Sequence, residues 1–233
     1  MKVADMMRVT DNRSKWLLLL LMILANIGGK SAYAQIEQPA NLVPGLMYDE
    51  VTSFIWKGRG REIIHHTHRL IGEPIEFEGE TVMPVYKLDS ETGEWTMTIP
   101  PSYIKTEGSK AFIFDNGAVS GERGWRLLYD FGIKPGEWTE VYRKVSPGFT
   151  HSKLKCVEVK TDPRYQNLKT ITLVPKTELN YHADLDDEFW NCKWIIGIGA
   201  TNGLFNPGAK GFGDSTRLNQ VSLDGEDFLQ REY

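Results

Sequence analysis

Apolar and polar side chains alternate with a period of two along several stretches of this chain. The clearest stretch is 190–198, where Trp190, Cys192 and Trp194 share one side and Lys193 falls on the other. A β-strand places successive side chains on opposite faces, so the pattern predicts strands with one buried face and one more polar face. Further strands are predicted at 63–70, 82–88, 95–99, 111–115, 125–131, 139–145, 154–161 and 170–174.

Strong turn signals such as Asn116-Gly117 and Pro147-Gly148 separate these stretches. Glycine, proline and asparagine favour the backbone angles of tight turns, so the stretches are connected as hairpins are. About nine strands without intervening amphipathic helices predict an all-β fold, an antiparallel sandwich or open barrel. The stretch 41–56 differs, because Leu46, Val51 and Phe54 would share one face of a short helix.

The first 34 residues differ in composition from the rest of the chain. A basic polar segment precedes an apolar run from Trp16 to Ile27, and Ala32 and Ala34 supply small side chains before Gln35. The run has about a dozen residues, whereas a bilayer span needs about 20. The pattern therefore predicts a signal peptide, 1–34, cleaved to leave one β-rich domain, 35–233. An uncleaved anchor or a buried helix is the alternative.

Charge and cysteine position refine this prediction. The chain has 27 Lys and Arg against 31 Asp and Glu, a net charge of −4. Such a balance gives no electrostatic reason to bind nucleic acid. The first cysteine is Cys156, so no thiol near the cleavage site could carry a lipid anchor. We therefore expect a periplasmic or secreted protein without a membrane span in the mature chain.

Cys156 and Cys192 are the two cysteines of the chain. An oxidising compartment and an even count favour a disulfide between them. The alternation places Cys192 on an apolar face, where an unoxidised thiol would also pack well. The sequence leaves both possibilities open.

Two groups of side chains are candidate metal ligands. His66 and His68 would point to one side of a strand and could bind zinc or copper with a third ligand, from His151, His182 or a carboxylate. The alternative is a polar edge strand whose imidazoles face solvent. Asp184 and Asp186 are candidate calcium ligands, although Phe189 stands where a helix-loop-helix site has glycine, and a solvated acidic turn is the alternative.

Aromatic side chains supply the candidate binding surface. Trp95, Trp125, Trp190 and Trp194 fall on the periodic faces and are expected in the core. Trp56 and Trp138 stand beside glycine or charged residues, and Phe205 and Phe212 lie in a glycine-rich stretch, 203–215, that is expected to be a long surface loop. Exposed aromatic rings on a sheet bind glycans or peptide surfaces. No cofactor is predicted, because no helix follows the glycines of 197–203.

Five ordered stretches resemble a family of uncharacterised secreted proteins from Gram-negative, gut-type bacteria. They are GEPIEFEGETVMPVYK (72–87), 107–114, LLYDFGIKPGE (127–137), WIIGIGATNGL (194–204) and LNQVSLDGEDFL (218–229). The chain departs from the family pattern at Ile196, where many members have Glu, and at Gln220, where many have Cys. The resemblance implies a secreted or periplasmic β-protein and assigns no catalytic residues.

The function expected from the sequence is a non-enzymatic binding or envelope-structural role, with a glycan, peptide or protein surface as partner. The alternative is a hydrolase acting on envelope or dietary polymers. That activity would need two carboxylates, or a carboxylate and a histidine, that converge in a pocket. A third possibility is a scaffold that pairs through an edge strand.

Overall fold

The computed structural model describes residues 38–55, 62–117, 121–145, 148–175, 192–208 and 215–230. Within these ranges the chain forms fifteen β-strands and one 3-10 turn, η1 (Pro163–Tyr165). The predicted all-β class is confirmed. The strands are β1 (Leu46–Ile55), β2 (Glu62–Ile71), β3 (Ile75–Phe77), β4 (Glu80–Leu88), β5 (Trp95–Met97), β6 (Tyr103–Glu107), β7 (Lys110–Asp115), β8 (Gly124–Asp130), β9 (Trp138–Val145), β10 (Gly148–Asp162), β11 (Leu168–Pro175), β12 (Cys192–Ile195), β13 (Gly199–Ala200), β14 (Ser215–Leu223) and β15 (Glu226–Gln230).

The predicted signal peptide, 1–34, lies outside the described residues. In the part of the chain that is described, no helix is long and apolar enough to span a bilayer. The strand count exceeds the expected value of about nine partly because β3 and β13 are too short for alternation to be visible in the sequence.

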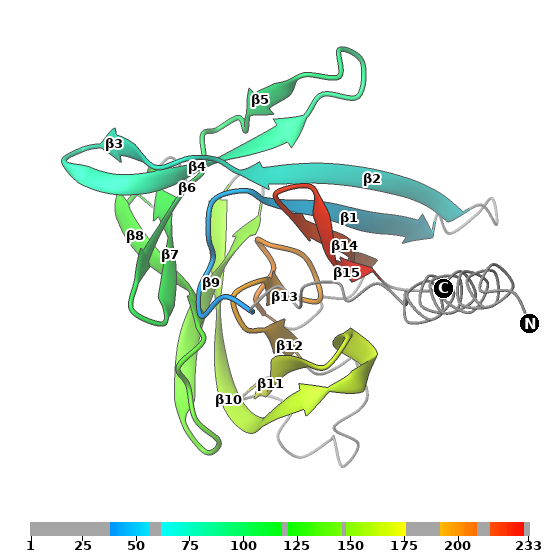
Figure 1. Ribbon diagram of the computed structural model, residues 1–233. Helices are drawn as coiled ribbons and strands as arrows, with labels where there is room; N and C mark the ends of the chain where they lie inside the picture. The colour runs from blue at the N-terminus through cyan, green and yellow to red at the C-terminus, as the bar shows by residue number, and fades with distance from the viewer. Residues whose placement is uncertain are drawn as a thin grey trace, which may run out of the picture. The chain divides into compact units, whose positions relative to one another are not determined.

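The larger sheet contains ten of these strands, all in antiparallel pairs among the residues described. Its path is β15-β14-β1-β2-β4-β6-β7-β8, with β3 and β5 paired to β4. Figure 1 shows β1 between β2 and β14, so segments from the two ends of the described chain are neighbours. This long-range pairing brings together side chains that are distant in the sequence.

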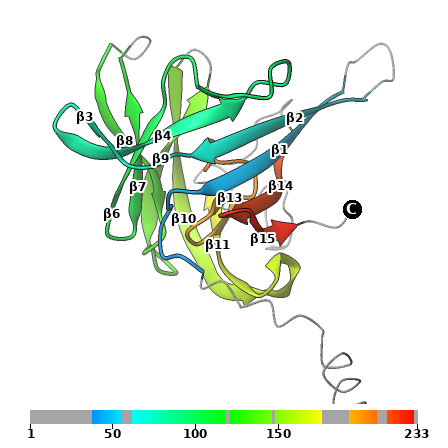
Figure 2. The same cartoon turned by 45° about the horizontal axis from the view of Figure 1, so that its top comes forward.

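The smaller sheet contains five strands in the order β13-β12-β11-β10-β9. Figure 2 shows the long strand β10 beside β9, and their register pairs Gly148 with Val145 and Lys155 with Trp138. The two sheets meet through aromatic side chains. The rings of Tyr129 and Trp194 lie 5.3 Å apart, edge to face, and both side chains are buried.

The segment that follows β12 connects the two sheets. Tyr129 of the larger sheet donates its hydroxyl hydrogen to the carbonyl oxygen of Leu204 at 2.6 Å and accepts the amide of Ala200 at 3.0 Å. The amide of Leu204 donates to Oε1 of Glu50 at 2.6 Å. Gly197 has a φ of +73° and lies against the backbone of Pro39, so only a residue without a Cβ fits there.

Two expectations about local structure are wrong. The stretch 41–56 contains strand β1 rather than a helix, because its burial alternates, with Leu46, Tyr48 and Glu50 buried. Lys193 was expected on a wetter face of its strand, yet its side chain is 2% exposed. Both faces of β12 are covered, and an ion pair with Asp162 holds the ammonium there.

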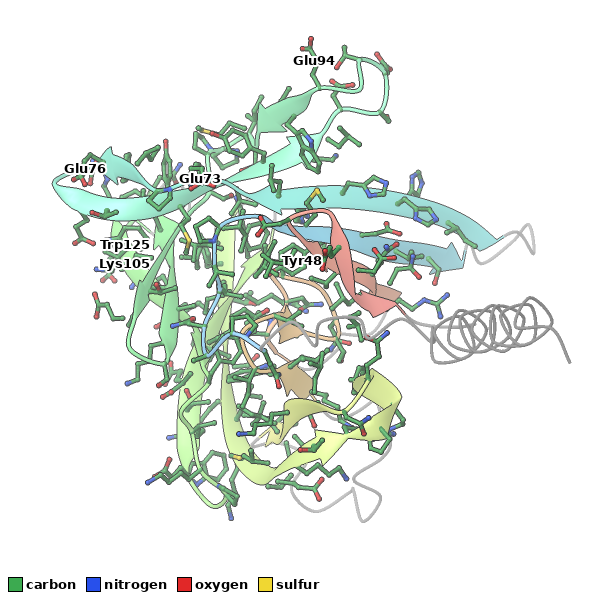
Figure 3. All side chains as sticks on the ribbon, in the orientation of Figure 1. Tyr48, Glu73, Glu76, Glu94, Lys105 and Trp125 are labelled. Carbon is green, nitrogen blue, oxygen red and sulfur yellow. The ribbon has the colours of Figure 1, made fainter. Side chains whose placement is uncertain are left out.

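The tryptophans that were expected in the core differ in how deeply they are buried. Trp194 is fully buried, as expected. Trp125 on β8 is half-buried, and Nζ of Lys105 lies 4.8 Å from its ring centroid. Figure 3 labels both side chains, on neighbouring parts of the larger sheet. Lys105 also forms ion pairs with Glu80 at 2.7 Å and Glu107 at 3.1 Å.

Candidate functional site

A groove with a volume of about 210 Å³ lies on one face of the larger sheet. Residues of β1, β2, β4, β5 and β14 line it, among them Met47, Asp49, His68, Trp95, Gln220 and Ser222. Figure 3 labels Glu94, which directly precedes Trp95 in the chain. The groove combines an aromatic ring with carboxylate, imidazole, amide and hydroxyl groups, which is the composition of a polar-ligand site.

Strand register explains why these side chains share a face. Asp49 pairs with His68 on one side and with Gln220 on the other. Met47 pairs with Ser222. Paired residues on adjacent strands point to the same face, and residues two apart on a strand do the same. The sequence thus places the polar groups of the groove on one face by simple alternation.

A β-bulge in β14 adds a further contact at Asp49. The register shifts so that Asp49 opposes Gln220 while Glu50 opposes Leu218, which leaves Asn219 as the extra residue. Nδ2 of Asn219 donates to Oδ2 of Asp49 at 2.6 Å. The bulge therefore fixes the carboxylate of Asp49 in place.

Asp49 also contacts both predicted metal-ligand histidines. Nδ1 of His66 lies 3.0 Å from Oδ1 of Asp49, and Nδ1 of His68 lies 3.7 Å from the same oxygen. The two imidazoles stack with centroids 6.3 Å apart. They share one face of β2, as strand alternation predicted, and the neighbouring carboxylate comes from β1.

No metal centre emerges from this arrangement within the described part of the chain. No group of three or more His, Cys, Asp or Glu there is arranged to hold a metal ion. His151, a proposed third ligand, lies on β10 of the smaller sheet, where its Nε2 is 3.9 Å from Oε1 of Glu140. The other proposed ligands, His182, Asp184 and Asp186, lie outside the described residues.

Trp95 is the exposed aromatic residue of the groove, and strand alternation did not identify it as such. We expected it in the core, but its side chain is 37% exposed. Its strand, β5, has three residues and pairs with β4. The signal that could have identified it is the cluster of Asp89, Glu91 and Glu94 around a short alternating stretch, which is typical of a surface hairpin rather than a core strand.

The two candidate binding aromatics that the structure describes, Trp138 and Phe205, do not share one surface. Trp138 is 41% exposed, as a binding surface requires, but it begins β9 in the smaller sheet, near the ammonium groups of Lys153 and Lys155. Phe205 was expected on a surface loop and is only 8% exposed, because its turn packs between the two sheets. Trp56 and Phe212 lie outside the described residues.

Of the two possibilities that the sequence leaves open for the cysteines, the structure shows unoxidised thiols and no disulfide. Cys156 of β10 and Cys192 of β12 each pair with Leu173 of β11, so a whole strand separates them. Two strand spacings place their Cα atoms roughly 10 Å apart, whereas a disulfide requires less than about 7 Å. Both cysteines therefore remain buried thiols.

The groove holds Asp, His and Ser side chains, but they do not form a catalytic triad. Ser222 lies on β14 and His68 on β2, with β1 between them. Two strand spacings and a register offset of two residues put their Cα atoms more than about 10 Å apart. The two side chains are too short to span this separation and bring the hydroxyl within about 3 Å of a ring nitrogen, as a nucleophile and its base require. The hydroxyl of Ser222 therefore cannot give its proton to His68 in this arrangement.

Comparison with protein-family models, with curated proteins and with solved structures finds no match for this chain. Its function must therefore be inferred from the groove itself.

Proposed function

We propose that this chain is an exported, non-enzymatic binding protein that holds one end of a carbohydrate chain in the groove of Asp49, His68, Trp95 and Gln220. The observation that carries this proposal is the exposed ring of Trp95 at the edge of a hollow that also contains polar side chains. A sugar has an apolar C–H face and a rim of hydroxyl groups. The groove offers an aromatic face for the first and hydrogen-bonding groups for the second.

The size of the groove restricts the ligand. Its volume of about 210 Å³ is below the roughly 300–1,000 Å³ of pockets that enclose a drug-sized molecule. We therefore expect one sugar ring to be held there while the rest of the chain extends into solvent. A short terminal unit suits this site better than an internal segment of a rigid polymer.

At the floor of the groove, backbone pairing favours a glycan over an extended peptide. β1 forms the floor of the groove and is paired with β14 on one side and β2 on the other. An added peptide strand needs a sheet edge with unpaired amides and carbonyls, and β1 offers none. Recognition at this floor must use side chains, which suits a ring of hydroxyl groups.

Export is part of the proposal and is supported by the sequence. The basic segment, the short apolar run and the small residues at Ala32 and Ala34 are typical of a signal peptide. The resemblance of 127–137 and 194–204 to secreted bacterial proteins agrees with this location. A periplasmic or secreted protein meets glycans of the envelope and of the surroundings.

The test is a screen of mono- and oligosaccharides by thermal shift, followed by calorimetric titration of those that raise the melting temperature. Trp95→Ala should weaken binding by about 2 kcal/mol, or about thirtyfold, because the stacking surface is lost. Trp138→Ala is the matched control, since Trp138 is equally exposed on the other sheet. Unchanged affinity in Trp95→Ala, or equal losses in both variants, would contradict the proposal.

A hydrolase is the second candidate, because a carboxylate and a histidine do converge in the groove, with Nδ1 of His68 3.7 Å from Oδ1 of Asp49. Incubation of each saccharide that binds, followed by measurement of newly released reducing ends, separates the two functions. Binding without release supports the binding protein. Release that is abolished in His68→Asn supports the hydrolase instead.

A further inference from the structure

Lys144 on β9 occupies an unusual position at the junction of the two sheets. Its amide donates to the carbonyl oxygen of Phe205 at 3.2 Å, and its Nζ lies 5.5 Å from the centroid of the same residue's ring. Cζ of Arg69 lies 4.9 Å from that centroid. Two cations from different sheets therefore share one aromatic ring.

The two cations differ in their partners. Nε of Arg69 donates to Oε2 of Glu50 at 2.9 Å, so a carboxylate balances its charge. Nζ of Lys144 donates to Oγ of Ser102 and, at 3.4 Å, to the carbonyl oxygen of Pro100. Within the described ranges no carboxylate forms an ion pair with Lys144. Its ammonium is thus solvated by neutral acceptors only, in a half-buried position.

Burial, and after it one neighbouring positive charge, disfavour the protonated form of the Lys144 amine. Desolvation by burial, followed by repulsion from Arg69, lowers the pKa of Lys144 to about 8. Arg69 is the charged group that faces Lys144 from β2, with Glu50 of β1 bonded to it. The segments 98–102 and 201–208 also pack here and contain no charged side chain. A lysine desolvated beside another cation is a known form of activated amine nucleophile.

The pKa of Lys105 is shifted in the opposite direction from that of Lys144. Burial alone would lower the pKa of Lys105, but its hydrogen bonds to Glu80 and Glu107 outweigh burial and raise it. Both lysines lie near aromatic rings and both are largely covered. The absence of a carboxylate partner among the described residues distinguishes Lys144.

We infer that Lys144 is a reactive amine that condenses with small aldehydes, including those that carry a carboxylate, to form an imine. The lone pair of the neutral Nζ attacks the carbonyl carbon, and the carbonyl oxygen takes up a proton to give a carbinolamine. Loss of the nitrogen proton and of the hydroxyl group as water leaves the C=N bond. The step needs no oxidant or reductant, and the site lies outside the groove proposed to bind glycans.

Ser102 is a positioning residue in this site and not a nucleophile. It is fully buried, and its Oγ also accepts a hydrogen bond from Oγ1 of Thr98 at 2.8 Å. A substrate carbonyl cannot reach a hydroxyl that is enclosed in this way. The reacting atom is therefore Nζ of Lys144, which Ser102 holds beside the ring of Phe205.

The probe is glyoxylate with sodium cyanoborohydride, which reduces each imine to a stable secondary amine that peptide mass spectrometry assigns to a lysine. At pH 7.5 about a quarter of an amine with a pKa near 8 is deprotonated, against about one in a thousand for an ordinary lysine. A less basic amine is also a weaker nucleophile, so the rate gain at Lys144 is smaller than the ratio of the two deprotonated fractions. We expect Lys144 to be modified about tenfold faster than the exposed Lys134 in the full chain.

Two conservative variants complete the experiment. Lys144→Arg should abolish the fast phase of modification seen in the intact mass, whereas Lys134→Arg should retain it. The ratio of the modification rates at Lys144 and Lys134 should also decrease above about pH 8, because the Lys144 amine is then largely neutral while the neutral fraction of Lys134 still increases. A fast phase that persists in Lys144→Arg, or a rate at Lys144 no higher than at Lys134, would overturn the inference.

Discussion

Nζ of Lys193 donates a hydrogen bond to Oδ2 of Asp162 at 3.0 Å, and both side chains are only 2% exposed. Arg164 donates to the same carboxylate through Nε and Nη2. Lys193 comes from β12 and Asp162 from the end of β10, so this ion pair connects two strands that are not neighbours in the smaller sheet. Charges buried at this depth persist only when they are paired.

Asp162→Asn should destabilise the protein by about 3–5 kcal/mol, because the ammonium of Lys193 would remain buried without its counter-charge. Chemical denaturation measures this difference in the free energy of unfolding. Adding Lys193→Met to Asp162→Asn should restore part of the lost stability, since the buried charge is then removed. If the single variant loses less than about 1 kcal/mol, water must reach Lys193 in the native state.

Stability should decrease in acid through the same carboxylate. Burial raises the pKa of Asp162, but hydrogen bonds from Arg164 and Lys193 together outweigh burial and lower it. A folded-state pKa below the unfolded value of about 3.9 adds stability that is fully present above that pH and is lost as the pH falls. Denaturation midpoints between pH 7 and pH 3 should fall more steeply in the wild type than in Asp162→Asn. Parallel curves would exclude this contribution.

Tyr129→Phe should cost about 1–3 kcal/mol although it removes only one oxygen. The hydroxyl donates to the carbonyl oxygen of Leu204 and accepts the amide of Ala200, and both backbone groups would be left buried and unpaired. Tyr142→Phe on β9 is a control, because the Tyr142 side chain is half-buried and still in reach of water. Equal losses in the two variants, measured by denaturant titration, would refute this account.

Gly197→Ala should be strongly destabilising, by about 2 kcal/mol or more. Its φ of +73° disfavours any Cβ, and the added atom would collide with the carbonyl oxygen of Pro39. Gly79→Ala provides the comparison, since Gly79 has a φ of +79° and nothing lies within 4 Å of its added Cβ. Both variants share the backbone strain. The difference between their melting temperatures therefore measures the cost of the collision alone.

Alternation in the sequence predicted the all-β class and placed Trp194 in the core, because these depend on neighbouring residues. The exposure of Trp95 and the burial of Lys193 depend on which strands cover a face, and the sequence does not contain that information locally. The partner of Lys193 is Asp162, more than 30 residues earlier in the chain. Alternation within 190–198 therefore predicts Lys193 on the solvent side, because it cannot reveal a buried partner elsewhere in the chain.

The groove could be predicted only in part. His66 and His68 were correctly placed on one face of a strand, yet their shared partner, Asp49, and the neighbouring Gln220 come from β1 and β14. Asp49 and Asn219 are separated by 170 positions in the sequence. Only the pairing of strands brings these residues together, and one sequence by itself does not reveal that pairing.

The turn at 203–206 couples the unfolding of the two sheets. Its backbone is bonded to Glu50 and Tyr129 of the larger sheet and to Lys144 of the smaller one. Neither sheet can separate from the other without breaking these bonds and exposing Leu204. Heating should therefore melt both layers in a single cooperative transition rather than in two successive steps.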